Sequence, residues 1–373
     1  MTECRMDHRA TGQADFCMAT TEEQLILTAN PSFLDLAVSE LQEIGTILAQ
    51  QSLADDVLLL TLAESFWEVA EPWRLAPPIF PHHICPVQSR VALRAQTNTD
   101  LAILQQTLAS ELLDLVDSTL PLSVQSRILT TLPYKPFDIN RTLSTYIHQQ
   151  LGVPIDVRAP HQVLSVVCAD WQRHTENKAQ TTAFLGVSPT VYNLSDWAGG
   201  MRRFAREEGQ ISRAEFKLLE ALEYFHLDLP ARGVALDLGA SPGGWTRVLR
   251  QHDQYVTAVD PGELDPRIAK DRGVRHKRMT AEEYLANDPD RFDLIVNDMR
   301  MDARDSARLM VAYVQQLYRS GRVLMTLKLP EENRRPILDH ALQILQEAYH
   351  ITGARQLFHN RSEITILLEP LAG

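Results

Sequence analysis

The feature that most constrains the fold lies near residue 240, where an apolar segment runs into a glycine-rich turn and then into a helix. Residues 234–245 read VALDLGASPGGW, and the helix is expected over Thr246–Gln251. Glycine permits unusual backbone angles and lets the backbone approach a ligand closely. The N-terminus of the following helix offers free N–H groups. The pattern therefore predicts a strand that ends at a ligand site, although a tight connection without a ligand has the same pattern.

Apolar segments continue to alternate with helical patterns from about Ile211 to Gly373. Such alternation predicts a mainly parallel sheet covered by helices, an α/β fold of Rossmann-like type over residues 211–373. The strand candidates are Val234–Leu238, Tyr255–Asp260, Phe292–Asp298, Arg322–Leu327 and Ile364–Leu368.

Asp260 ends the strand that follows the glycine-rich turn. In dinucleotide sites a carboxylate about 20 residues after the turn accepts the hydroxyls of a ribose. Neither G-x-G-x-x-G nor G-x-x-x-x-G-K-[ST] is present, which argues against NAD and nucleoside triphosphates. The turn fits an adenosyl ligand that needs no phosphate site. A turn or capping role for Asp260 before Pro261 is the alternative.

Asp237–Trp245 resembles the S-adenosylmethionine loop of the FtsJ-type RNA 2'-O-ribose methyltransferases. Thr280 stands where that family usually has an acid beside the adenine, with Glu282 and Glu283 beyond it. The family's Lys-Asp-Lys-Glu tetrad has candidates in the same order here. The resemblance implies S-adenosyl-L-methionine as cofactor and a catalytic set of Lys217, Asp298, Lys328 and Glu363, with cofactor-binding residues Gly239, Ser241, Pro242, Gly243, Gly244, Trp245, Asp260, Thr280 and Asp298.

Asp298 and Lys328 each follow an apolar strand at its carboxyl end, the edge where ligands bind in open α/β sheets. Taken singly, each of the four tetrad residues has an ordinary alternative, as a solvated lysine, a capping aspartate or a strand-edge charge. Their joint presence beside the glycine-rich turn favours a catalytic site. No metal site is expected.

Methyl transfer to a ribose 2'-hydroxyl requires in-line attack on a methyl carbon and removal of the hydroxyl proton. A lysine with a pKa of about 10.4 is neutral in only about one molecule in a thousand at neutral pH, so a nearby cation must lower the pKa. The resemblance implies that Lys328 acts on the hydroxyl, while Lys217, Asp298 and Glu363 orient and tune it. Which group finally accepts the proton stays open.

The first 95 residues are expected to form a small α+β domain. Gln24–Thr28 and Val57–Leu62 have the pattern of strands, and Pro31–Gly45 has that of an amphipathic helix, which together predict a βαβ start. The proline-rich stretch Ala76–Pro86 predicts a connection without regular structure. A ferredoxin-like unit over residues 1–95 is the expectation.

The next segment, residues 96–183, predicts a second α+β unit. Helices are expected over Asp100–Val116 and Asp138–Leu151, the latter with Asp138 as N-cap and Gly152 at its end. Strands are expected over Ser123–Thr130 and Val163–Ala169, and the polar Asp170–Thr182 suggests a linker. Residues 123–171 resemble a THUMP domain, an RNA-binding module. With a linker over residues 184–210, the layout resembles that of the RlmM-type 23S ribosomal RNA (cytidine-2'-O) methyltransferases.

The net charge of −12 is unevenly distributed, since residues 1–100 hold 14 acidic residues against 5 Lys and Arg. Because charges are screened over about 8 Å at physiological salt, an acidic N-terminal domain does not exclude an RNA partner elsewhere. Residues 264–279 carry six basic and two acidic residues, and residues 199–217 add four arginines. These clusters favour RNA backbone binding, with solvated surface charge as the alternative.

Two alternatives to a ribose methyltransferase stay open. An RNA base methyltransferase is disfavoured, because Asn297-Asp-Met-Arg replaces the usual [N/D]-P-P-[Y/F] loop and no cysteine lies in the catalytic segment. A non-catalytic RNA-binding or ribosome-assembly protein is the other. The apolar runs are shorter than a membrane span and the N-terminus lacks a signal pattern, so a cytoplasmic protein with reduced thiols, away from membranes, is expected. A monomer is the favoured state.

Overall fold

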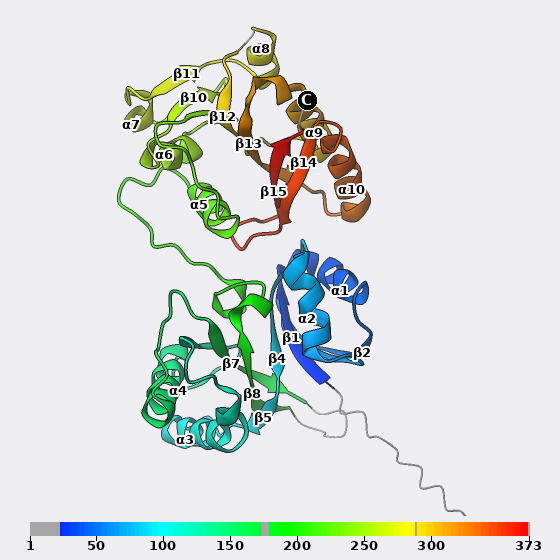
Figure 1. Cartoon of the computed structure of the whole chain (residues 1–373), viewed down its shortest axis with the longest axis vertical. Helices are drawn as coiled ribbons and strands as arrows, with labels where there is room; N and C mark the ends of the chain where they lie inside the picture. The colour runs from blue at the N-terminus through cyan, green and yellow to red at the C-terminus, as the bar shows by residue number, and fades with distance from the viewer. Residues whose placement is uncertain (1–22, 173–178, 288, 372–373) are drawn as a thin grey trace, which may run out of the picture.

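A computed structural model describes residues 23–172, 179–287 and 289–371. These residues form three sheets, two of four strands and one of seven. Figure 1 shows the large sheet with its helices at the top and the two small units side by side below it. Within the described residues, no helix combines the length and hydropathy that a membrane crossing requires.

The first unit is an antiparallel sheet in the order β2-β3-β1-β4, with two helices inserted in the chain order βαββαβ. This is the ferredoxin-like arrangement. The second helix begins with a capping box, because the Ser65 hydroxyl accepts from the Glu68 N–H and the Glu68 carboxylate accepts from the Ser65 N–H. The elements are β1 (Glu23–Ala29), α1 (Leu34–Gln42), β2 (Ile47–Ala54), β3 (Val57–Leu62), α2 (Phe66–Leu75) and β4 (Pro81–Val87).

Two expectations for this unit were wrong. The βαβ start is not parallel: β1 pairs antiparallel with β3, because β2 intervenes as one arm of a hairpin. Part of the proline-rich stretch is a regular strand, β4, whose Pro86 lies opposite Leu25. Because β4 is the outermost strand, the N–H groups that its prolines lack can face away from the ladder.

The second unit is a sheet in the order β5-β8-β7-β6 with two helices packed on it. The left-handed backbone of Gly152, with φ of 70°, ends the second helix as the sequence predicts. Asp138 is not its N-cap; it stands three residues inside and accepts a hydrogen bond from the Lys135 N–H. The elements are β5 (Ser89–Ala92), α3 (Thr97–Thr107), β6 (Leu122–Ile128), α4 (Pro136–Leu151), β7 (Gln162–Trp171) and β8 (Gln180–Pro189).

The two ends of the polar stretch at 170–182 are strands and not a linker, with Asp170 opposite Thr181 in the antiparallel pair of β7 and β8. Residues 173–178 between them lie outside the described residues. Since β5 and β8 pair with each other, this sheet extends beyond the expected limits of 96 and 183 on both sides. The division into an N-terminal, a THUMP-like and a catalytic part stays a proposal, with these strands assigned to the middle part.

The seven-stranded sheet has the order β11-β10-β9-β12-β13-β15-β14, parallel except for β15, which runs antiparallel to both neighbours. The fold class predicted from the alternating pattern is confirmed. The strands β11 and β14 were not predicted from the sequence of this sheet. Its elements are α5 (Glu215–Tyr224), β9 (Val234–Leu238), α6 (Gly244–Gln251), β10 (Tyr255–Val259), α7 (Pro266–Ala269), β11 (Val274–Lys277), α8 (Ala281–Ala286), β12 (Phe292–Asn297), α9 (Ala303–Ala312), β13 (Leu317–Lys328), α10 (Arg334–Leu345), β14 (Tyr349–Arg355) and β15 (Glu363–Pro370).

Each face of this sheet has its own apolar layer. Leu324 packs with the face that α5 and α6 cover, whereas its neighbours Val323 and Met325 pack with α8, α9 and α10. Alternate residues of a strand point to opposite faces, so the strands are apolar throughout.

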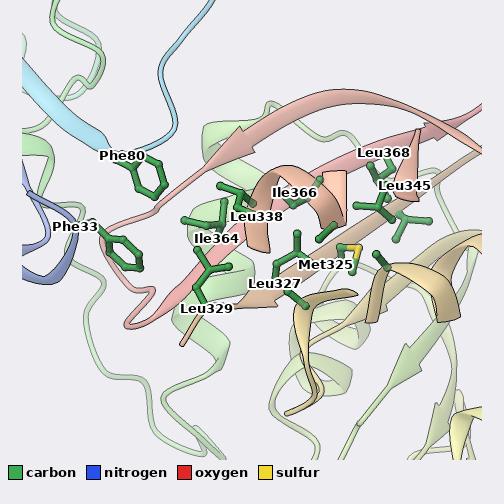
Figure 2. Packing of buried hydrophobic residues seen from close by; sticks show 14 of the residues in the cluster. Phe33, Phe80, Met325, Leu327, Leu329, Leu338, Leu345, Ile364, Ile366 and Leu368 are labelled. Atoms are coloured by element: carbon green, nitrogen blue, oxygen red, sulfur yellow. The ribbon is translucent and has the colours of Figure 1, made fainter. Parts of the chain in front are cut away.

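The ferredoxin-like unit shares a core with the seven-stranded sheet. Phe33 stacks on Phe80 with ring centroids 5.4 Å apart. Both rings lie against the end of β13 and the start of β15, near Leu329 and Ile364 (Figure 2). All four side chains are almost fully buried. The two units therefore pack as one body at this junction.

Replacing Phe33 by alanine should lower the free energy of unfolding by about 3–5 kcal/mol, because a fully buried ring is removed from the shared core. Urea unfolding followed by tryptophan fluorescence measures this. The control is Phe137→Ala, since Phe137 is 66% exposed and its loss should cost no more than about 0.5 kcal/mol. Equal losses in the two variants would contradict a shared core.

Candidate active site

Two charged side chains of the site face each other because of strand register. Lys328 ends β13 and Glu363 begins β15, and the two are direct partners in the antiparallel pair. Opposed residues project to the same face of a sheet. Two residues earlier, Thr326 lies opposite Thr365 and projects to that face as well.

Asp298 joins this group from the neighbouring strand. It directly follows β12, whose Asn297 lies beside Met325 of β13. The Thr326 hydroxyl donates to Asp298 Oδ1 at 2.7 Å, and the Lys328 ammonium forms an ion pair with the same carboxylate. The Lys328 Nζ also donates to Thr326 Oγ1 at 2.7 Å. Asp298 thus lies at the centre of the group.

Lys217 completes the group from helix α5. Its Nζ lies 3.3 Å from Asp298 Oδ2 and forms an ion pair with Glu363. The structure therefore brings together all four residues that the sequence predicted as a tetrad. Their catalytic roles stay predictions.

The protonation of this group follows from burial and charge. Burial lowers the pKa of Lys328, and the nearby Lys217 ammonium lowers it further, against the opposing effect of the Asp298 carboxylate. Burial alone would raise the pKa of Asp298, but the Lys328 and Lys217 ammonium groups hold it below its usual value. The arrangement thus keeps an anion beside a lysine that is easier to deprotonate than usual.

The tetrad lies in a cleft of about 1120 Å³ that the glycine-rich turn also lines. Gly239 has φ of 77°, and a Cβ there would come within 2.4 Å of the Met299 side chain, so this position requires glycine. Gly243, with φ of 110°, does not line the cleft; it lies against Ile268. The predicted cofactor residues that do line the cleft are Gly239, Ser241, Pro242, Gly244, Trp245, Asp260, Thr280 and Asp298.

Asp260 has the turn role that the sequence left open, and its proposed contact with a ribose stays a prediction. Its carboxylate accepts from the Ser241 N–H at 3.1 Å and the Gly262 N–H at 2.6 Å, which ties the two turns together. It also lines the cleft. Thr280 caps α8 through Glu283, whereas Glu282 lines the cleft beside Thr280. Glu282 is therefore the acid nearest to the place where the family pattern expects one.

The cleft suits a cationic adenosyl ligand. Asp237 is fully buried at its base, where burial raises the pKa to about 7 and the Asp298 charge adds to the rise, although the Thr246 hydroxyl donates to it at 2.6 Å. A ligand with a sulfonium and an ammonium group would offset this concentration of carboxylates. Ser212 Oγ and His359 Nε2 also line the cleft and have no hydrogen-bond partner among the described residues, so polar groups remain for a ligand.

The basic cluster at 264–279 is less cationic in the structure than its sequence suggests. Arg267 pairs with Asp265, Arg275 with Asp290 and Arg278 with Glu263. Two of these acids lie outside the cluster in sequence, so only tertiary contact reveals the neutralisation. The exposed cations at the cleft itself are Arg213, Arg300 and Arg361. Of these, sequence analysis singled out only Arg213 as a basic residue for RNA.

Among the described residues, no group of three or more His, Cys, Asp and Glu side chains could hold a metal ion. Cys85 and Cys168 are buried free thiols far from the carboxyl edge of the large sheet in sequence. The reduced state expected for Cys4 and Cys17 concerns positions outside the described residues.

If Asp260 binds the cofactor ribose as the sequence predicts, Asp260→Ala should weaken S-adenosylmethionine binding by about 1.5–3 kcal/mol, because a charge-assisted hydrogen bond would be lost. Isothermal calorimetry measures the affinity, and circular dichroism checks the fold. Asp302→Ala is the matched control, since Asp302 caps α9 and pairs with Arg304 without lining the cleft. Binding within twofold of wild type would reduce Asp260 to a turn residue.

Comparison with known proteins relates part of this chain to RNA methyltransferases. Residues 210–344 match the family model of the FtsJ-like methyltransferases. The protein "Ribosomal RNA large subunit methyltransferase M" of Halorhodospira halophila is 36% identical over 196 residues, which cover 51% of this chain and 55% of that protein. The protein of the same name from Alkalilimnicola ehrlichii is 36% identical over 186 residues, 48% of this chain and 51% of that protein. The chain thus spans about half the length of the curated relatives it matches.

Solved structures show only a distant likeness. TrmN from Thermus thermophilus has a TM-score of 0.38 and 19% identity, with 94% of this chain and 100% of that chain covered. The fibrillarin pre-rRNA processing protein of Methanococcus jannaschii has a TM-score of 0.35 and 13% identity, covering 55% and 89%.

Proposed function

We propose that this chain, which carries an FtsJ-like domain over residues 210–344, is an S-adenosylmethionine-dependent 2'-O-ribose methyltransferase that acts on RNA. The observation that carries the proposal is the contact of two lysines with one carboxylate, Asp298, inside the cleft of the glycine-rich turn. A lysine beside a second cation is the arrangement that deprotonating a hydroxyl near neutral pH requires.

The bound cofactor would supply an electrophilic methyl group. Asp260 would accept from its ribose, and Glu282 and Thr280 would lie at its adenine end. The carboxylates of Asp237 and Asp298 would compensate its positive charge. The turn around Gly239 would let the backbone approach the adenosyl group closely.

Lys328 would receive the proton of the ribose hydroxyl as the bond to the methyl group forms. Asp298 and Thr326 hold its Nζ in place, and Lys217 favours its neutral form. Glu363 would in turn hold Lys217. Orientation of this kind contributes much of the rate in group transfer, because the reacting atoms are held in line.

We further propose 23S ribosomal RNA as the substrate, because the name of the relatives refers to large-subunit ribosomal RNA, and the cytoplasm as the place of action. Arg213, Arg300 and Arg361 at the cleft would contact phosphates, and the two small N-terminal units would select the RNA. A base methyltransferase or a non-catalytic assembly protein would lack methyl transfer to a ribose hydroxyl.

Lys328→Arg should reduce single-turnover methyl transfer by about 10²- to 10⁴-fold, because a guanidinium cannot deprotonate in this pH range. Cofactor affinity should stay near that of wild type. The measurement is tritium transfer from S-adenosylmethionine to undermodified ribosomal RNA, with the methylated position mapped to ribose or base. Substantial activity in the Arg variant would show that the position supplies only charge or orientation.

The pH dependence gives an independent check. Since the neutral form of Lys328 is the active one, the single-turnover rate should rise with pH and reach a plateau above the pKa of Lys328. Lys217→Met removes a cation that lowers this pKa, so its profile should move to higher pH by about one unit. An unchanged profile in Lys217→Met would contradict electrostatic tuning by Lys217.

A further inference from the structure

One loop connects the catalytic residues to the rest of the molecule. Residues 356–362 join β14 to β15 and lead directly into Glu363, the first residue of β15, so this loop acts together with the β13–β15 register in setting where the Glu363 carboxylate lies. The loop also carries His359, whose ring packs against Phe204 and Phe216 with centroids 5.5 and 5.2 Å away and lines the cleft.

Helix α5 holds this loop through Glu220, a residue with no part in the chemistry proposed above. Glu220 is 6% exposed. One carboxylate oxygen accepts from the Phe358 N–H at 2.9 Å, and the other accepts from the His359 N–H at 2.8 Å. Burial raises the pKa of Glu220 to about 7. Burying a carboxylate costs free energy, and this one accepts hydrogen bonds from two backbone N–H groups of the loop.

The ferredoxin-like unit holds the same loop from the other side. The Gln356 N–H donates to the Ile79 carbonyl at 2.8 Å, and the Asn30 side chain donates to the Arg361 carbonyl at 3.2 Å. The guanidinium of Arg355, which is 2% exposed, donates to the carbonyls of Pro78 and His82. The loop is therefore fixed between α5 and the N-terminal unit.

We propose that Glu220 is a positioning residue for methyl transfer: by holding the 356–362 loop on α5, it keeps the Glu363 carboxylate in contact with Lys217. Lys217 and Glu220 lie three residues apart on α5. The contact of Lys217 with Glu363 and the contact of Glu220 with the loop therefore both start from the same rigid helix. The Lys217–Glu363 pair then has a fixed geometry relative to Asp298 and Lys328. This inference rests on the proposed methyl transfer and adds a group outside the tetrad to it.

Glu220→Gln tests the proposal, because an amide can accept from one loop N–H but presents an NH₂ group to the other. Single-turnover methyl transfer at saturating RNA and cofactor should slow by about 10- to 100-fold, since the tetrad is misplaced. The dissociation constants of both ligands should stay within twofold. The control is Glu223→Gln. Glu223 lies three residues after Glu220 on α5 and pairs with Arg202 at the surface, so the rate of this variant should stay within twofold of wild type.

The pH profile separates positioning from a merely structural role. The charged groups around the Lys328 ammonium are Asp298, Lys217 and Glu363, and the Glu363 charge raises the pKa of Lys328. If Glu220→Gln lets Glu363 move away, the profile should shift to lower pH, as in Glu363→Gln. A slowed variant with the wild-type profile, or a variant with the wild-type rate, would overturn the proposal. Should Glu220→Gln not fold, Glu220→Asp serves, because its shorter carboxylate cannot reach both N–H groups.

Amide hydrogen exchange tests the loop without any activity. The N–H groups of Phe358 and His359 should be protected in the wild-type protein and should exchange faster in Glu220→Gln but not in Glu223→Gln. If Glu220→Gln exchanges faster than the wild type but the wild type transfers no methyl group, the proposed function is contradicted and the loop contact stands. Methyl transfer by the wild type with unchanged exchange in Glu220→Gln would contradict only the inference.

Discussion

The site depends on the carboxylate of Asp298. Without it, the ammonium groups of Lys217 and Lys328 would repel each other in a partly buried place, where charge is poorly compensated by solvent. Asp298 accepts from both lysines and from Thr326, so one carboxylate holds both ammonium groups and compensates their charge. Its position at the end of a central parallel strand places this contact at the edge where the glycine-rich turn opens.

The ferredoxin-like N-terminal unit packs directly against the part of the molecule that holds this site and is not joined to it by the chain alone. It shares an apolar core with β13, β15 and α10 through Phe33 and Phe80, and its backbone bonds to the loop before Glu363. Domain interfaces of this apolar kind restrict relative motion. RNA held by the N-terminal unit would thus be presented to the tetrad in a fixed orientation.

The sequence by itself determined the class of the catalytic fold and the identity of the tetrad. A strand, a glycine-rich turn and a helix are encoded within a dozen neighbouring residues, because periodicity and glycine act locally. The four candidates Lys217, Asp298, Lys328 and Glu363 followed from strand ends and from resemblance to a known motif. The contact of Asp298 with Lys328 could be expected because the carboxyl ends of parallel strands meet at one edge. Lys217 on helix α5 and Glu363 at the start of the antiparallel strand β15 were brought to that edge by the tertiary structure.

Only the tertiary structure decided the strand pairings, ion pairs and burial that depend on residues distant in the chain. The strands β2, β5, β11 and β14 are stabilised by their neighbours in a sheet, so their own residues give a weak signal. The proline-containing β4 is regular only because it lies at an edge. Arg275 and Arg278 form ion pairs with Asp290 and Glu263, which partly neutralise the basic cluster. Glu220 resembles any surface glutamate in the sequence, and only the return of the chain after β14 buries it against two backbone N–H groups, because those groups come from residues more than 130 positions away.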